Sequence, residues 1–136
     1  MRDRVLALDF GEVRIGIAIS DPFGWTAQPL PFVVNNGEKW EALKKLITEY
    51  DVKEILIGLP KNQHGEDSEK AKIVRVFAQE VLQHLGIEPF FRDERYSTVA
   101  ANRHLISMDM KRAKRKLYVD SQSAAFVLQG YLDAKK

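Results

Sequence analysis

The sequence predicts an α/β fold in which a mixed β-sheet carries helices on its faces. Three observations predict it. The first part of the chain contains three short apolar stretches separated by turns, which is typical of antiparallel strands. The second part alternates helical and strand-like patterns, which favours right-handed crossovers between parallel strands. The 136 residues, 45% of them hydrophobic, suffice for one core, so we expect a single domain over residues 1–136.

The first two predicted strands, residues 5–10 and 15–19, form a hairpin around the tight turn at residues 11–14. Residues 30–34 follow a proline-rich passage and supply a third strand, whose prolines favour the edge of a sheet. In the rest of the chain, apolar residues recur at helical spacing in some segments and run continuously in others. These predict a helix around residues 40–50, a strand at 53–58, a helix at 68–85 that ends at Gly86, a strand at 87–92, a short helix starting near Ser97, and a last helix that starts at Asp120 or Ser121.

Composition excludes several classes of protein. The chain has no cysteine, which removes disulfides, thiolate metal sites and cysteine nucleophiles. The apolar run near the N-terminus is too short for a signal peptide, and no stretch approaches the roughly 18 apolar residues of a membrane span. We therefore expect a cytoplasmic protein without membrane association.

Positive charge is concentrated in one part of the chain. The net charge is only +2, but six of the 21 Lys and Arg residues lie between Arg103 and Tyr118, together with a single acidic residue, Asp109. A local excess of this kind attracts polyanions such as nucleic acid. The alternative is an ordinary solvated loop.

The first candidate for chemistry is Asp9, at the end of the first apolar strand. A carboxylate beside buried backbone is costly unless it is paired, protonated or bound to a cation. Gly11 and Gly16 follow it in a D-x-G-x-x-x-x-G pattern, which is typical of hairpins that contact phosphate in more than one class of enzyme. The alternative is that Asp9 simply belongs to the turn.

Two further acidic positions follow predicted element boundaries. Asp93-Glu94-Arg95 comes just after a strand end, where open α/β sheets bind ligands, although such a triplet can also be solvated or internally salt-bridged. Asp120 opens the predicted last helix, where it would serve as an N-cap. The small residues after Asp120 let that helix approach the sheet closely, which would bring its carboxylate toward the end of the first strand.

Carboxylates gathered at strand and helix ends are the ligands that Mg²⁺ prefers. Two such ions, roughly 3.5–4 Å apart, can activate a water and stabilise the leaving oxygen of a phosphodiester. The histidines do not compete for this role because His64, His84 and His104 are scattered along the chain. His64 is a weak candidate for a substrate contact.

The sequence resembles the YqgF/RuvX family of pre-16S rRNA nucleases, which are related to Holliday-junction resolvases and have a ribonuclease H-like fold. This resemblance implies a five-stranded sheet of order 3-2-1-4-5 and a metal-dependent nuclease that acts on structured RNA or DNA and processes the 5′ end of precursor 16S rRNA. It implies that Asp9, Glu94 and Asp120 bind Mg²⁺ or Mn²⁺ in a two-ion site. The resemblance rests on Leu6–Gly11 with Gly16-Ile17-Ala18, on Gly58-Leu59-Pro60 with Gly65, on Asp93–Thr98 with Ala100-Ala101, and on Val119-Asp120-Ser121 with Ala124-Ala125.

One feature of the implied sheet bears on the third acid. The strand at residues 53–58 would lie beside the first strand, yet it ends in Gly58-Leu59-Pro60 without a carboxylate. Glu94 would therefore have to reach across the crevice from the next strand out. Asp93 is the substitute ligand if Glu94 cannot reach.

The candidate contacts to phosphate are basic. They would fix the position of a nucleic acid without reading its sequence. Arg95 has the alternative of pairing with Asp93 or Glu94, and Trp25 and Tyr96 are base-stacking platforms or, more simply, packing residues. The phosphate contacts are Arg14, Lys61, Arg95, Lys111, Arg112, Lys114, Arg115 and Lys116.

Three functions fit these patterns to different degrees. The first is a metal-dependent nuclease acting on precursor rRNA or, alternatively, on branched DNA in repair. The second is a non-catalytic RNA-binding ribosome-assembly factor, in which the acids are only caps and turn residues. The third, a phosphotransferase of the actin-like type, would need a second phosphate hairpin that this chain does not show. We expect a monomer or homodimer.

Overall fold

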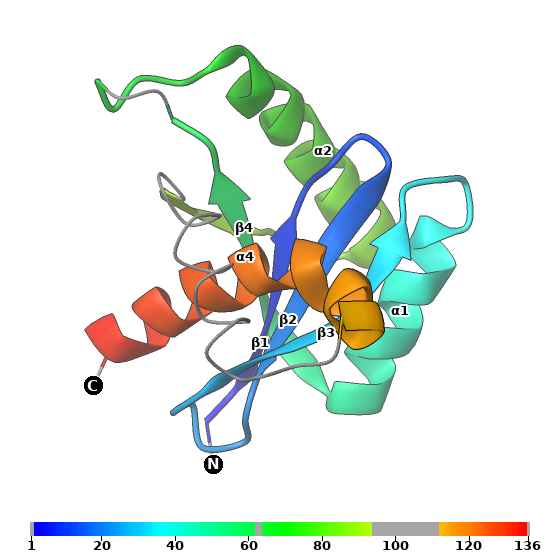
Figure 1. The fold of residues 1–136 in the computed structure, drawn as a ribbon, viewed down its shortest axis with the longest axis vertical. Helices are drawn as coiled ribbons and strands as arrows, with labels where there is room; N and C mark the ends of the chain where they lie inside the picture. Colours follow the sequence, from blue (N-terminus) through cyan, green and yellow to red (C-terminus); the bar gives the residue numbers. More distant parts are fainter. Residues whose placement is uncertain (1, 62–63, 94–111, 136) are drawn as a thin grey trace.

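The computed structural model describes residues 2–61, 64–93 and 112–135, with side chains in the last range from Tyr118 onward. These residues form one sheet and three helices (Figure 1). The strands are β1 (Arg4–Asp9), β2 (Arg14–Ser20), β3 (Ala27–Val34), β4 (Val52–Leu59) and β5 (Phe90–Asp93), and the helices are α1 (Lys39–Tyr50), α2 (Glu69–Leu85) and α4 (Arg112–Ala134).

The sheet has the strand order β3-β2-β1-β4-β5. β1 runs antiparallel to β2 and parallel to β4, and β4 runs parallel to β5. The predicted mixed five-stranded sheet of order 3-2-1-4-5 is therefore confirmed. The proline-containing strand β3 lies at one edge, as its composition predicted.

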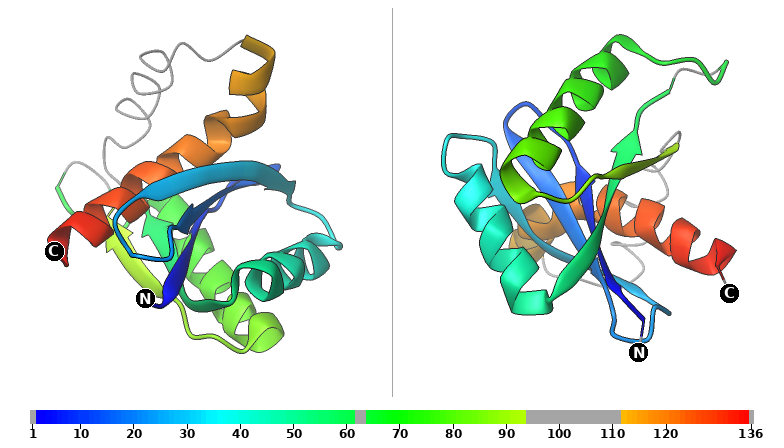
Figure 2. Two further views of the ribbon diagram at one scale, coloured as in Figure 1. Left: turned by 90° about the horizontal axis from the view of Figure 1, so that it is seen from below. Right: turned by 180° about the vertical axis from the view of Figure 1, so that it is seen from behind.

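The helices cover both faces of this sheet (Figure 2). α1 and α2 pack on one face, against a core that includes Leu6 and Leu8 of β1. α4 packs on the other face, where Val5 and Ala7 contribute to a second core. Successive side chains of a strand point to opposite faces, so the odd-numbered positions of β1 face α4.

Helix α2 begins and ends where the sequence predicts. The Ser68 hydroxyl accepts a hydrogen bond from the backbone N–H of Ala71, at 3.1 Å, and so caps the first turn. Gly86 ends the helix with a φ of 73°, which a residue without a side chain adopts at little cost. These caps fix where the preceding loop enters the helix.

The prediction for the last helix was wrong at its N-terminus. α4 starts at Arg112, so Asp120 lies inside the helix and does not open or cap it. Residues 112–120 contain neither Gly nor Pro and are rich in Lys, Arg, Ala and Leu, which favour helix. The basic residues from Arg112 to Lys116 accordingly lie on the first turns of a helix. The short helix expected near Ser97 lies outside the described residues.

No helix in the described part of the chain is both long enough and apolar enough to cross a membrane.

Candidate active site

The β1–β2 hairpin places Asp9 at the carboxyl end of β1. The turn beyond it needs glycine at position 11, because a Cβ there would collide with the backbone carbonyl of Arg14. The Asn35 side-chain amide donates to the Gly11 carbonyl at 2.9 Å, and the Asn35 backbone N–H donates to the Val13 carbonyl at 2.9 Å. The predicted tight turn is thus held from the end of β3.

Helix α4 lies directly on β2 at Gly16. A Cβ at Gly16 would collide with the backbone carbonyl oxygen of Asp120 and would lie 3.1 Å from the Cα of Ser121. The pairing of β2 with β3 is irregular between Ile15 and Ile17. The buried Ser121 hydroxyl accepts a hydrogen bond from the Ile17 backbone N–H there, at 2.9 Å. Gly16, the second glycine of the motif, is therefore required because the backbone of α4 lies directly against it.

The backbones of Asp9 and Asp120 both lie beside Gly16 at this contact. Asp9 pairs with Gly16 in the β1–β2 ladder, and its odd-numbered position places its side chain on the α4 face. Asp120 reaches the same glycine from the helix. Asp9 is half-buried, and the side chain of Asp120 is 35% exposed, so both carboxylates lie at the boundary between the core and solvent.

Arg14 lies beside this pair of acids. Its guanidinium is 3.9 Å from a carboxylate oxygen of Asp120, and its carbon Cζ is 5.2 Å from the ring centre of Phe32. The Arg14 side chain is 53% exposed, and an ion pair so open to water is weak. Arg14 can therefore leave Asp120 for another anion at little cost.

β4, the parallel neighbour of β1, carries no acid at the end of the sheet where Asp9 lies. Leu8 pairs with Ile57, and β4 continues through Gly58 to Leu59 before Pro60 and Lys61. The absence of a carboxylate here, noted in the sequence, is borne out by the register.

Asp93 ends β5 on the other face of the sheet. Phe91, two residues earlier, packs in the core beneath α1 and α2, whereas Phe90 packs with α4. Alternation along the strand gives Asp93 the orientation of Phe91, away from the face that carries Asp9 and Asp120. The predicted residues Glu94, Arg95, Tyr96 and Lys111 lie outside the described residues.

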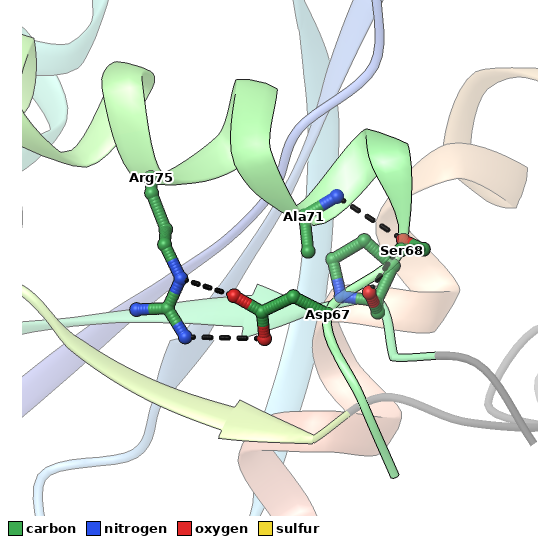
Figure 3. Close-up of polar contacts among 5 residues, drawn as sticks. Asp67, Ser68, Ala71 and Arg75 are labelled. Carbon is green, nitrogen blue, oxygen red and sulfur yellow. Dashed lines mark hydrogen bonds and ion pairs between the residues drawn. The ribbon is translucent and has the colours of Figure 1, made fainter. Parts of the chain in front are cut away.

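The loop before α2 carries Lys61 and has its own polar contacts (Figure 3). Lys61 and Asp67 form an isolated antiparallel pairing across it. Arg75 donates to both carboxylate oxygens of Asp67, at 2.6 and 3.2 Å. These hydrogen bonds lower the pKa of Asp67 and raise that of Arg75. The pair was not predicted from the sequence, because eight positions separate the partners and no motif marks them.

The basic residues at the start of α4 share a helix with Asp120. Arg112, Lys114, Arg115 and Lys116 precede Asp120 by four to eight positions, which corresponds to about 6 to 12 Å along the helix axis. Trp25 is 62% exposed, in the β2–β3 turn at the opposite end of β1 from Asp9. It is neither buried nor beside the candidate site.

The described residues contain no group of three His, Asp or Glu side chains placed to hold a metal ion. Two of the three predicted acids, Asp9 and Asp120, have backbones that lie beside Gly16. The third, Glu94, lies outside the described part of the chain. Carboxylate oxygens that are partly open to solvent are suitable donors for a hard divalent cation.

The strand order, with one helix laid across β1 and β2, defines a ribonuclease H-like fold of the resolvase type. The structure of T. thermophilus RuvC in complex with Holliday junction substrate matches with a TM-score of 0.58 at 13% identity, covering 98% of this chain and 96% of that one. The Fowlpox virus Holliday junction resolvase matches with a TM-score of 0.56 at 15% identity, covering 96% and 99%. At these identities the likeness concerns the fold.

Sequence comparison assigns the family. The chain belongs to the RuvX family, described as Holliday junction resolvase, whose model matches residues 3–134. A relative from Moorella thermoacetica is 42% identical over 132 residues, covering 96% of this chain and 94% of its own. Another from Shouchella clausii is 45% identical over 134 residues, with the same coverage. Both carry the name "Putative pre-16S rRNA nuclease".

These findings confirm the family resemblance, the fold class and the nuclease class, a hydrolase of phosphodiester bonds. Resolvase-like nucleases generally use divalent metal ions. The nuclease relatives, with resolvase structures that contain Holliday junction DNA, support binding of nucleic acid.

Proposed function

We propose that this protein is a Mg²⁺- or Mn²⁺-dependent nuclease in which Asp9, Asp120 and Glu94 hold two metal ions. We further propose that it cleaves structured nucleic acid and processes the 5′ end of precursor 16S rRNA in the cytoplasm. The observation that supports the metal site most strongly is the convergence of Asp9 and Asp120 on Gly16.

The donor set fits the ions. Asp9 and Asp120 offer only carboxylate oxygens, which suit Mg²⁺ and Mn²⁺. Such ions, when bound, supply a reactive water and stabilise the leaving oxygen. The chain's part is to hold both carboxylates on one face of the sheet, through the contact of α4 with β2. Glu94 completes the site in the proposal because Asp93 has the orientation of the opposite face, whereas the next position in an extended chain would return to the α4 face.

The basic residues hold the substrate backbone. Arg14 is close enough to Asp120 that a phosphate bound beside the acids lies within reach of its guanidinium. Lys61 extends the contact along the carboxyl end of the sheet, and the basic residues Arg95, Lys111, Arg112, Lys114, Arg115 and Lys116 supply further contacts to phosphate in this proposal. Contacts of this type give affinity that depends on salt and not on sequence.

The names of the relatives favour precursor 16S rRNA as the substrate. The family description and the resolvase fold favour branched DNA as the second candidate. We propose that the active species is a monomer or homodimer.

Cleavage assays test the proposal directly. Purified protein is incubated with precursor 16S rRNA or with a four-way DNA junction, each with Mg²⁺ and with Mn²⁺. We expect D9N, D120N and E94Q to lose at least about 100-fold in cleavage rate, since each removes a metal ligand worth several kcal/mol in the transition state. D93N is the matched control and should cleave like the wild type.

The result has three readings. Preference for the RNA supports the rRNA assignment, and preference for the junction supports the DNA alternative. Equal cleavage by the wild type and D9N would contradict the metal site. Binding that survives loss of all three acids, without turnover by the wild type, would make the protein a non-catalytic RNA-binding factor.

A further inference from the structure

The loop between β4 and α2 begins with a residue that the proposed function uses. Lys61 lies three positions beyond Gly58, which is level with Asp9 because Leu8 pairs with Ile57. Three extended residues span about 10 Å, so Lys61 lies outward of Asp9 along the direction of β4. A nucleic-acid backbone that crosses the carboxyl end of the sheet at Asp9 can therefore continue onto Lys61.

The base of this loop is closed by two contacts. Lys61 pairs with Asp67 in an isolated antiparallel bridge. The Ser68 hydroxyl donates to the Pro60 carbonyl at 2.7 Å while it caps α2. Lys61 is thus held directly by its pairing with Asp67 and, through the preceding Pro60, by the residue that caps α2. These contacts determine where the backbone of Lys61 lies, and Figure 3 shows the hydrogen bonds of Ser68 and Asp67 among them.

Arg75 connects this loop to the rest of the fold. Its guanidinium donates through Nε and Nη2 to the two oxygens of Asp67, in the two-pronged geometry that fixes orientation as well as distance. The same guanidinium lies 5.2 Å from the ring centre of Phe91 in β5. Arg75 therefore ties the loop both to α2 and to the neighbouring strand.

The ion pair between Asp67 and Arg75 contributes too little to the free energy of folding for stability alone to account for its two-pronged geometry. Both side chains are partly open to water, where ion pairs add little to the free energy of folding. The charge of Lys61 acts on Asp67 as well, since it contributes to the lowered pKa of that carboxyl. The Asp67 carboxylate is thus hydrogen-bonded to Arg75, and the charges of Lys61 and Lys72 act on it as well.

We propose that Asp67 is a positioning residue for nucleic-acid binding: held by Arg75 and paired with Lys61, it keeps Lys61 where it can contact the phosphate backbone. This inference rests on the proposed function, in which Lys61 contacts phosphate.

The direction in which one substitution changes the affinity for nucleic acid distinguishes a positioning role of Asp67 from the effect of its charge alone. Asp67→Asn removes a negative charge and frees Arg75, so electrostatics alone predicts tighter binding of a polyanion. Loss of positioning predicts weaker binding, because Lys61 is no longer presented. The two accounts therefore predict opposite changes in affinity.

The experiment measures the affinity of the full chain for a fluorescent stem–loop RNA by anisotropy, in EDTA and over a series of salt concentrations. We expect D67N to weaken binding about 3- to 10-fold and to reduce the magnitude of the salt slope by about one, as K61A should, because one phosphate contact is lost. The double variant D67N/K61A should bind no more weakly than K61A.

The chain offers a matched control. Glu69 lies in the first turn of α2 and pairs with Lys72 at 3.1 Å, so E69Q removes one charge and one exposed ion pair from the same helix and leaves both hydrogen bonds of Asp67 with Arg75 in place. We expect E69Q to bind as the wild type does or slightly more tightly. R75K keeps the charge but loses the two-pronged geometry, and it should weaken binding less than D67N.

Each failure has its own signature. If D67N binds as tightly as E69Q while K61A binds weakly, the positioning role is wrong and the proposed function stands. If K61A binds like the wild type, Lys61 is not a phosphate contact and the inference fails with it. If the wild type does not bind RNA or the four-way junction at all, the proposed function itself is wrong.

Discussion

The two sides of the candidate site are held in place by different physics. On one side, α4 lies against β2 through a backbone contact at Gly16 and a buried hydrogen bond from Ile17 to Ser121. On the other side, the loop that carries Lys61 is held by an ion pair between Asp67 and Arg75 that is partly open to water. The first side carries the acids of the proposed metal site, and the second carries Lys61, the proposed contact to phosphate.

This difference shows which groups of the site must be positioned precisely. Metal ligands must hold their positions closely, and a close-packed backbone contact permits no alternative arrangement. A contact to phosphate tolerates small shifts, so exposed polar groups suffice to hold it. Substitutions on the α4 side should therefore affect stability and cleavage together, whereas those on the loop side should affect mainly binding.

The largest effect should come from Gly16→Ala. The added methyl group would collide with the Asp120 carbonyl, so α4 must move away from β2. We expect about 3 kcal/mol of destabilisation, at the upper end for overpacking, with loss of cleavage. Urea unfolding and the cleavage assay measure both. Gly37→Ala is the control, since a Cβ at Gly37 meets nothing within 4 Å, and it should leave both unchanged. A stable, active G16A would contradict the packing account.

Ser121→Ala should have the next largest effect on stability. It leaves the Ile17 N–H buried without its acceptor, which costs roughly 1–3 kcal/mol. The comparison is Gly86→Ala, which places a side chain in the left-handed conformation at the far end of α2 and costs roughly 1–2 kcal/mol. At temperatures where both variants are folded, we expect S121A to lower the cleavage rate because it loosens Asp120. Equal cleavage rates for the two variants would mean that the α4 contact does not position the acid.

Arg14→Gln should change two affinities in opposite directions. Its positive charge lies 3.9 Å from Asp120 and opposes a cation bound there, so the variant should bind Mn²⁺ a few-fold more tightly by calorimetry. The same variant loses a phosphate contact and should bind RNA more weakly. If the affinities for Mn²⁺ and for RNA change in the same direction, Arg14 does not both oppose the bound cation and contact the RNA.

The smallest effect should be the pH dependence of the Asp67–Arg75 pair. The hydrogen bond from Arg75 lowers the pKa of Asp67 in the folded state, so the pair stabilises the fold above the ordinary aspartate pKa of about 3.9. That contribution is lost as the pH falls through the lowered folded value. The difference in unfolding free energy between the wild type and D67N should therefore stay constant near neutral pH and shrink below about pH 4. A difference that grows on acidification would contradict this linkage.

The sequence predicts the elements whose signals are local. The period of the apolar residues and the caps Ser68 and Gly86 fix α2, and the prolines place β3 at an edge. The position of Asp9 at a strand end also follows from local pattern. The prediction of where α4 starts was wrong because Asp120 has the chemistry of an N-cap, yet helix-forming residues continue N-terminal to it.

The contacts that complete the site are not local. In the sequence Gly16 is only the second glycine of the hairpin motif, and the structure shows that it admits the backbone of α4. The ion pair of Asp67 with Arg75 depends on how the loop folds back onto the helix. The orientation of Asp93 depends on where β5 starts, and a shift of one residue would reverse its face.

Binding of Mn²⁺ measured by calorimetry tests the central claim most directly. The account predicts that D9N and D120N each weaken Mn²⁺ binding at least about tenfold, that D9N/D120N is no worse than additive, and that D93N binds like the wild type. Mn²⁺ binding that is unchanged in both D9N and D120N would show that these residues, although the backbones of both lie beside Gly16, do not form the metal site.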